Sequence, residues 1–199
     1  MTIRVLVADD QAMIRGALAG LLDLERDIEV VAQAADGAQA LDELARLASA
    51  DAPARASAPI DVAIIDVEMP RMDGITATQA IRSRFPGVRV VIVTTFGRPG
   101  YLQRALDAGA TGFTVKDAPV ETLAEGVRTV AAGGRAIDQN LALEALATGS
   151  SPLTDREADV LREVEGGGTI ADIAHSLHLS QGTVRNHVSS SMLKMNART

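Results

Sequence analysis

Three carboxylates in this sequence directly follow apolar runs, where a charge is costly unless something requires it. Asp9 and Asp10 come after "IRVLVA", and Asp66 comes after "IDVAII". Like charges that share a site repel one another unless a cation lies between them, and Mg²⁺ prefers oxygen ligands. We therefore predict that Asp10 and Asp66 bind Mg²⁺ directly and that Asp9 binds it directly or through water. A backbone carbonyl near Glu68 is expected to add another oxygen.

Two further side chains follow later apolar runs in the same way. "VRVVIVTT" ends with Thr94 and its neighbour, and "TGFTV" runs into Lys116. A metal ion, a hydroxyl and an ammonium that converge on Asp66 would suit an incoming phosphoryl group. Asp66 would then be a nucleophile that accepts phosphate as an acyl phosphate. A single Asp after a strand is more often a solvated turn or a helix cap, so the prediction depends on all four strand ends occurring together.

The elements that must position these side chains alternate between short apolar runs and segments with helical periodicity. Strands are expected at 3–8, 28–32, 60–65, 88–95 and 111–115, and helices at 13–24, 37–48, 74–85, 100–110 and 119–132. Strands separated by helices pair in parallel, with helices on both faces of the sheet. The predicted fold class is therefore α/β, a (βα)5 doubly wound parallel sheet of the flavodoxin-like kind. All its strands end at one edge, where function collects in such sheets.

The chain divides into two predicted domains. Residues 1–133 form the α/β domain, 134–151 form a linker with a short helix at 138–147, and 152–199 form a smaller all-α domain. A Pro/Ala/Ser-rich stretch at 49–59 is longer than a connection of this kind needs, and we interpret it as an exposed insertion.

The all-α domain has the pattern of a helix-turn-helix. "TIADIAHSLH" and "QGTVRNHVSSSMLKMN" are two helical segments joined by the turn "HLSQ". In the second segment, 181–196, a stripe of apolar side chains is expected to face the core: Val184, Val188, Met192 and Met195. A polar set remains for DNA, in which some members would read base edges in a major groove and others would contact phosphates. The set comprises Thr183, Arg185, Asn186, His187, Ser189 and Lys194, with His187 at its margin and with Thr183 and Lys194 nearer the phosphates.

Composition and charge narrow the class of protein. The 199 residues carry a net charge of −7, which argues against a protein that binds nucleic acid over its whole surface. Residues 173–199, however, contain basic side chains and no Asp or Glu. The chain has no cysteine and no apolar run near the roughly 20 residues that span a bilayer. We expect a cytoplasmic protein with no membrane partner.

These motifs resemble those of a known family. "VADD", "DVEMPRMDG", "VTT" and "GFTVKDAP" resemble the receiver domain of two-component response regulators, and "LTDREADVLREVEGG" through "KMNA" resembles the LuxR-type helix-turn-helix. Together they are similar to the NarL/FixJ family of DNA-binding response regulators. The resemblance implies that Asp66 is the phosphoacceptor, that Asp9 and Asp10 hold Mg²⁺, and that Lys116 binds the phosphate. Thr94 would be the switch hydroxyl and Phe113 the switch aromatic, although Phe113 would serve equally well as plain core.

The same resemblance implies partners and a mode of action. A sensor histidine kinase would phosphorylate the chain, which would then dimerise, bind a palindromic operator in double-stranded DNA and regulate transcription without being an enzyme. "TTFGRPGYLQRALDAGATGF" is most similar to the branch that includes regulators of membrane-lipid desaturation. Family members usually continue into a fourth helix of the DNA-binding domain, and we expect that helix to be missing from a chain that stops at Thr199.

The alternative is a Mg²⁺-dependent phosphohydrolase of the haloacid-dehalogenase type, which also forms an aspartyl phosphate. That class needs Asp-x-Asp after its first strand, whereas here Asp9 and Asp10 are adjacent and residue 68 is Glu. No segment reads as a substrate cap domain. Turnover separates the two hypotheses, because a switch takes up one phosphoryl group and a hydrolase releases phosphate continuously.

Overall fold

The computed structural model describes residues 2–49, 60–95, 100–138, 141–142, 153–177 and 179–195. The chain forms two compact units, Met1–Thr148 and Gly149–Thr199. Residues 50–59 of the predicted insertion, and most of the predicted short helix at 138–147, lie outside the described residues.

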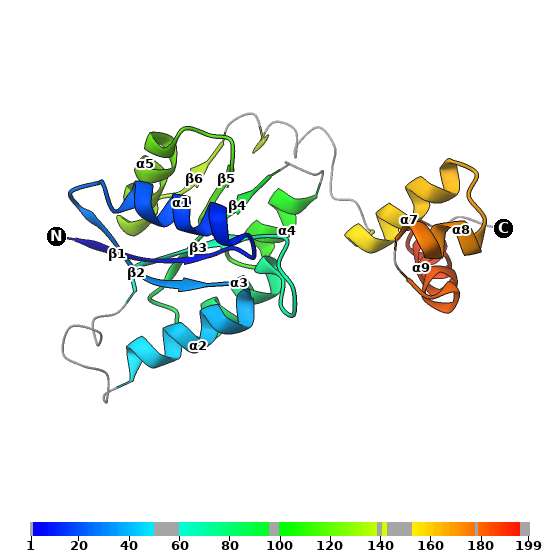
Figure 1. Ribbon diagram of the computed structural model, residues 1–199, viewed down its shortest axis with the longest axis horizontal. Coiled ribbons are helices and arrows are strands. Elements are labelled where there is room, and N and C mark those ends of the chain that lie inside the picture. Colours follow the sequence, from blue (N-terminus) through cyan, green and yellow to red (C-terminus); the bar gives the residue numbers. More distant parts are fainter. Residues whose placement is uncertain are drawn as a thin grey trace. The chain divides into compact units, whose positions relative to one another are not determined.

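The first unit contains a parallel sheet with the strand order β2-β1-β3-β4-β5-β6 (Figure 1). Its strands are β1 (Ile3–Ala8), β2 (Ile28–Ala34), β3 (Val62–Asp66), β4 (Arg89–Thr94), β5 (Gly112–Val115) and β6 (Ala136–Ile137). The five predicted strands are all present. The sixth corrects the prediction, because Ala136 and Ile137 pair in parallel with β5 although the sequence placed them in a linker. Two residues are too few to show a strand periodicity.

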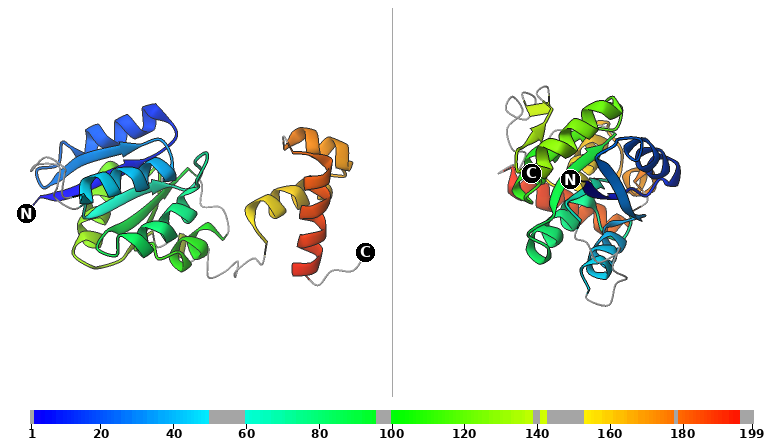
Figure 2. Two further views of the ribbon diagram at one scale, coloured as in Figure 1. Left: turned by 90° about the horizontal axis from the view of Figure 1, so that it is seen from below. Right: turned by 90° about the vertical axis from the view of Figure 1, so that its left-hand side faces the viewer.

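Helices cover both faces of this sheet (Figure 2). They are α1 (Ala12–Leu22), α2 (Gly37–Ala48), α3 (Gly74–Arg84), α4 (Tyr101–Asp107) and α5 (Val120–Ala131). Alternate residues of β1 belong to different cores: Leu6 belongs to the core that also contains side chains of α2, α3 and α4, and Val7 to the core that contains side chains of α1 and α5. This alternation is what a strand buried on both faces requires. The predicted doubly wound α/β fold is confirmed.

The second unit consists of α7 (Asp155–Glu165), α8 (Ile170–Ser176) and α9 (Gln181–Lys194). A capping box begins α7, since the Thr154 hydroxyl accepts from the Glu157 N–H and the Glu157 carboxylate accepts from the Thr154 N–H. Its small core includes Val160, Ile173 and Val184.

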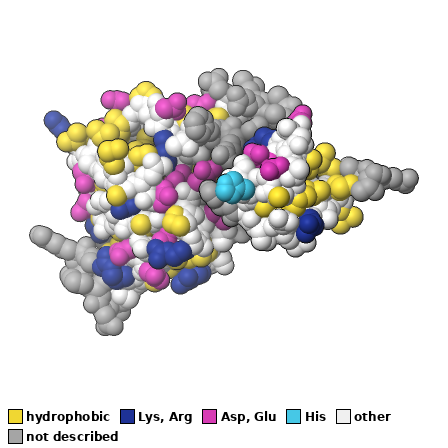
Figure 3. Space-filling view, turned by 45° about the vertical axis from the view of Figure 1, so that its right-hand side comes forward, with side chains coloured by type: hydrophobic (Ala, Val, Ile, Leu, Met, Phe, Trp, Pro, Cys, Tyr) yellow, Lys and Arg dark blue, Asp and Glu magenta, His cyan; other side chains and the backbone are white. Residues whose placement is uncertain are grey.

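One predicted core residue of α9 lies elsewhere. Met195 caps the C-terminal end of the helix and is 53% exposed, so it does not extend the buried stripe. Leu193 is 80% exposed, and hydrophobic side chains are visible on the surface of this unit (Figure 3).

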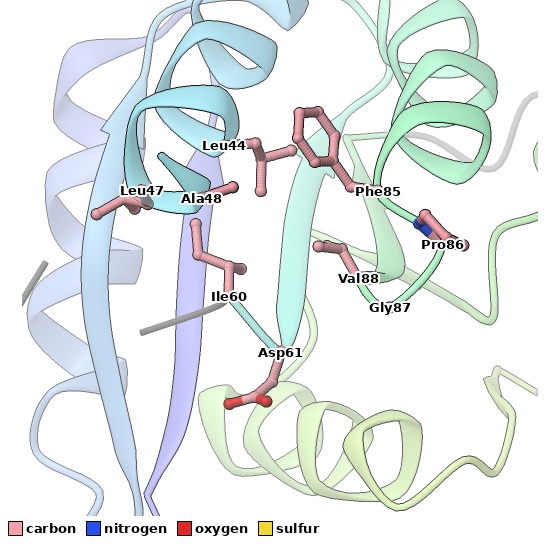
Figure 4. Close-up of a pocket in the computed structure, with 9 residues that line it drawn as sticks. All are labelled: Leu44, Leu47, Ala48, Ile60, Asp61, Phe85, Pro86, Gly87 and Val88. Atoms are coloured by element: carbon pink, nitrogen blue, oxygen red, sulfur yellow. The ribbon is translucent and has the colours of Figure 1, made fainter. Parts of the chain in front are cut away.

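An apolar pocket of about 300 Å³ lies at the opposite edge of the sheet from the ends of β1 and β3 (Figure 4). Its lining comes from the C-terminal half of α2 and from the segments that lead into β3 and β4: Leu44, Leu47, Ala48, Ile60, Asp61, Phe85, Pro86, Gly87 and Val88. Because it opens at the amino ends of these strands, it is separate from the predicted phosphoryl site. No helix in the described part of the chain is long and apolar enough to cross a membrane.

Candidate functional site

The three predicted carboxylates meet at the carboxyl edge of the sheet. Asp9 follows β1 and is 1% exposed, Asp66 ends β3 and is 4% exposed, and the neighbouring Asp10 is exposed. Each offers an oxygen that lies within 4.8 Å of the others. Two of these acids are thus buried next to one another, an arrangement that is unfavourable without a compensating cation.

Lys116 supplies one positive charge to this cluster. It follows β5, and its N–H donates to the carbonyl of Thr94 at 2.7 Å. Its ammonium nitrogen lies 2.6 Å from Asp9 Oδ2 and 3.0 Å from Asp66 Oδ2. Burial alone would lower the pKa of Lys116, but the two carboxylates outweigh burial, and the pKa is raised. The lysine is therefore a fixed cation between the acids.

The protonation of Asp66 is set by two opposing effects. Burial raises the pKa of Asp66 from its ordinary value to about 6, and the ion pair with Lys116 limits that rise. The N–H of Glu68 also favours the ionised form. At neutral pH the carboxylate is therefore mostly ionised, and the ionised form is the one that acts as a nucleophile.

Backbone geometry fixes Asp66 relative to α3. The side chain of Asp73 caps α3 by accepting from the N–H groups of Ile75 and Thr76. Gly74 then packs directly on Asp66, because a Cβ added at this glycine would lie 2.0 Å from the Asp66 carbonyl oxygen. The Asp-Gly pair after the Pro-containing loop thus allows α3 to begin against the end of β3.

The remaining predicted residues of this site lie on β4, on β5 and just after β3. Thr94 ends β4 and is 2% exposed, and Phe113, 1% exposed, lies beside Ile92 of that strand. The exposed Glu68 side chain accepts a hydrogen bond of 2.9 Å from the hydroxyl of Tyr101. This last contact was not predicted, since nothing local in the sequence relates the start of α4 to the end of β3.

In the second unit, α9 presents a polar face. Arg185, Asn186 and Ser189 are exposed, while His187 is partly buried. Thr183 is also partly buried, and its hydroxyl lies 2.8 Å from that of the N-cap, Ser180. Of the six side chains predicted to contact DNA, these three are therefore exposed on α9, and Thr183 and His187 are partly buried.

Comparison with known proteins identifies both units. Residues 5–128 match the response regulator receiver domain, and residues 151–199 match the bacterial regulatory proteins of the luxR family. The chain is a DNA-binding response regulator of the NarL/LuxR family. It is a transcriptional regulator and not an enzyme, so the phosphohydrolase alternative is not supported.

Individual relatives resemble the regulator over nearly its whole length. The uncharacterized transcriptional regulatory protein YvfU and the transcriptional regulatory protein DesR, both of Bacillus subtilis (strain 168), are each 39% identical over 98% of this chain and 92% of their own. The response regulator ChrA of a heme-sensing two-component system is 30% identical in sequence, and its crystal structure matches this chain with a TM-score of 0.59. The matched region covers 100% of this chain and 92% of the ChrA chain. The equal identities to DesR and YvfU do not single out one branch of the family.

One side chain of the regulator predicted to contact DNA has a partner within the second unit. The ammonium of Lys194 donates to both carboxylate oxygens of Glu157, at 3.0 and 2.8 Å. Ser190 adds a hydrogen bond of 2.6 Å to the same carboxylate. Glu157 thereby joins α7 to α9, and the Lys194 ammonium is engaged within the second unit.

The Glu157 network predicts a pH-dependent contribution to stability. Burial would raise the pKa of Glu157, but hydrogen bonds from Lys194, Ser190 and Thr154 outweigh burial and lower the pKa to about 2. Because the folded pKa lies below the unfolded one, the stabilisation is complete above about pH 4.5 and is lost as the pH falls towards 2.

A Glu157→Gln variant is expected to lose about 2 kcal/mol of stability at neutral pH. This is less than a fully buried pair would lose, because 35% of the Lys194 side chain is exposed. Its stability should also depend less on pH in the acid range. Urea unfolding of the full chain, followed by NMR signals of α9, measures both effects. Glu165→Gln, an exposed position on the same helix, is the control, and parallel pH profiles for wild type and Glu157→Gln would contradict the prediction.

Proposed function

We propose that Asp66 accepts a phosphoryl group from the phosphohistidine of a sensor histidine kinase. A carboxylate oxygen of Asp66 forms the new P–O bond while the P–N bond to the kinase histidine breaks, and the released imidazole takes up a proton. The observation that carries this proposal is the buried Asp66 carboxylate 3.0 Å from the Lys116 ammonium. That ammonium can bind a phosphoryl oxygen as negative charge accumulates there.

Mg²⁺ is proposed to bind at the same edge of the sheet. The donor set fits a hard cation, since three carboxylates offer oxygens within 4.8 Å of one another. Asp10 and Asp66 would bind directly, and the carbonyl of Glu68 would add an oxygen. Asp9 is proposed to act through water, because its Oδ1 already accepts from the Gln11 N–H and its Oδ2 pairs with Lys116. Bound there, Mg²⁺ would neutralise charge on the phosphoryl oxygens.

The response to phosphorylation is proposed to pass through Thr94 and Phe113. The Thr94 hydroxyl would move towards the phosphoryl group, and the Phe113 ring would fill the space that it leaves. Both side chains are almost fully buried, which supports a rearrangement of packing between two discrete states.

The output is proposed to be sequence-specific binding to DNA in the cytoplasm. Arg185 and Asn186 would contact base edges in the major groove, and Thr183, His187 and Ser189 would contact the backbone or flanking bases. A phosphorylated dimer with two-fold symmetry would match a palindromic operator.

Phosphoryl uptake from acetyl phosphate tests the switch against catalytic turnover. With Mg²⁺ present, we expect at most one phosphoryl group per chain, and chelation of Mg²⁺ should prevent uptake. Intact-protein mass spectrometry measures the adduct, and a colorimetric assay measures released phosphate. Continuous release at many equivalents per chain would refute the proposed role of Asp66 as a switch.

Dimerisation is proposed to use α1 and α5. Met13 on α1 is 84% exposed, and a Cβ added at Gly16 or Gly20 would meet nothing within 4 Å. This side of α1 therefore has room for a second helix to approach closely.

We expect beryllofluoride with Mg²⁺ to convert the wild-type chain to a dimer at tens of micromolar protein. The Met13→Glu substitution should weaken that dimer about tenfold, because it places a charge in an apolar contact. Sedimentation velocity measures the association. The control is Gln103→Glu, an exposed position on α4. Equal dimerisation of Met13→Glu and wild type would place the interface elsewhere.

A further inference from the structure

A buried carboxylate outside the phosphoryl site is bound to the loop that follows Asp66. The Asp36 side chain is 0% exposed and caps α2 by accepting from the Gln39 N–H at 3.0 Å. Its other oxygen pairs with the guanidinium of Arg71. A buried carboxylate needs a partner for its charge, and Arg71, whose side chain is 62% exposed, supplies one at the protein surface.

The backbone of Arg71 needs this support. Its φ is 63°, and it is the sole non-glycine residue with a positive φ among the described residues. L-residues disfavour this region because the Cβ approaches the backbone, so the surrounding contacts must hold Arg71 there. The ion pair with Asp36 is such a contact. The Gly37 N–H adds a second by donating to the carbonyl of Met72 at 3.1 Å.

The same loop is closely tied to the phosphoacceptor. The Gly74 N–H donates to the Val67 carbonyl at 2.9 Å, which closes the segment 67–74 on itself. The segment also touches the start of α2. A Cβ on Gly37 would lie 2.8 Å from the Met72 carbonyl oxygen, so the backbone of Gly37 is in direct contact with that of Met72. The segment includes Glu68, whose carbonyl is a proposed Mg²⁺ ligand. A change at Arg71 is therefore transmitted to the proposed metal site through a short, constrained loop.

We propose that Asp36 and Arg71 are positioning residues for Mg²⁺ binding, an inference that rests on the proposed function of the acidic site. Their ion pair holds Arg71 at positive φ and so keeps the Glu68 carbonyl and the Asp66 carboxylate in the arrangement that receives the cation. Without the pair, residue 71 relaxes and the oxygens must be reordered when Mg²⁺ binds. Groups that orient metal ligands typically contribute about tenfold or more to metal affinity.

The test is calorimetric titration of the full chain with Mg²⁺ alone. Asp36→Asn keeps an oxygen that can cap α2 but loses the charge. Arg71→Ala loses the guanidinium and, like other L-residues, disfavours a positive φ. We expect each variant to bind Mg²⁺ about tenfold more weakly, and the double variant to bind no more weakly than either single one, because both changes remove the same interaction.

The substitutions at Asp36 and Arg71 change the net charge in opposite directions, which separates an effect of the loop from an effect of charge alone. Arg71→Ala removes a positive charge and by long-range electrostatics alone would strengthen Mg²⁺ binding, so weaker binding must come from the loop. Glu43→Gln breaks the exposed pair with Arg46 on α2 and reproduces the charge change of Asp36→Asn without contact to the loop. It should bind Mg²⁺ as wild type does, and Arg71→Lys should recover part of the lost affinity.

Arg71→Ala with an affinity within about twofold of wild type, well short of the effect expected of an orienting group, would overturn the inference. So would a double variant whose loss is the sum of the two single losses. Failure of the wild-type chain to bind Mg²⁺ would be a different result, because it would refute the proposed metal site itself.

Discussion

An Asp66→Ala variant is expected to take up no phosphoryl group from acetyl phosphate in the presence of Mg²⁺. Its methyl group provides no nucleophile, and the other carboxylates of the site differ from Asp66 in their surroundings. Asp9 has both oxygens engaged, and Asp10 is exposed. Intact-protein mass spectrometry with peptide mapping measures the adduct. The loss should be complete, which makes this the largest effect that we predict.

Asp42→Ala, an exposed position on α2, is the matched control and should be phosphorylated as fully as wild type. Circular dichroism should show both variants folded, since Lys116 retains its pair with Asp9 when Asp66 is absent. An undiminished adduct in Asp66→Ala would assign phosphorylation to another residue and would remove the basis of the proposed switch.

An Arg185→Ala variant is expected to bind a palindromic operator about thirtyfold more weakly, which corresponds to about 2 kcal/mol for a lost base-edge contact. Binding to unrelated DNA should weaken much less, so the ratio of specific to non-specific affinity should fall. Arg185 is exposed on α9, and its removal should leave the second unit folded. Fluorescence anisotropy at two salt concentrations measures both affinities.

Arg162→Ala is the control for this experiment, because Arg162 is an exposed arginine of the same unit that pairs with Asp159 on α7. It should leave the specificity ratio unchanged. If Arg185→Ala weakened binding to both kinds of DNA equally, Arg185 would be a phosphate contact and base readout would belong to other residues.

The strand ends could be predicted because burial and charge are visible in short windows of sequence. "IDVAII" is too apolar to be anything but buried, so the Asp66 that follows must lie where the strand stops. Parallel pairing then brings Asp9, Asp66 and Lys116 to one edge. The capping box at Thr154 and Glu157 was predictable for the same reason, since both its partners lie within one helical turn.

The contacts that escaped prediction join residues far apart in the sequence. Asp36 and Arg71 are 35 residues apart, and Glu157 and Lys194 are 37 apart. Each of these side chains looks like an ordinary surface charge, and only the packing of two elements decides that they meet. A lysine near the end of a helix carries no local sign of an internal partner, so the sequence predicted only a DNA contact for Lys194, which stays a prediction.

The bond between Tyr101 and Glu68 gives this chain a built-in optical probe. The sequence contains one tyrosine and no tryptophan, so ultraviolet emission excited above the phenylalanine band comes from a single phenol. That phenol is 4% exposed and donates to a carboxylate two residues from Asp66. Its spectrum therefore reports on the junction of α4 with the β3–α3 loop, and events at that junction can be followed in real time without attaching a dye.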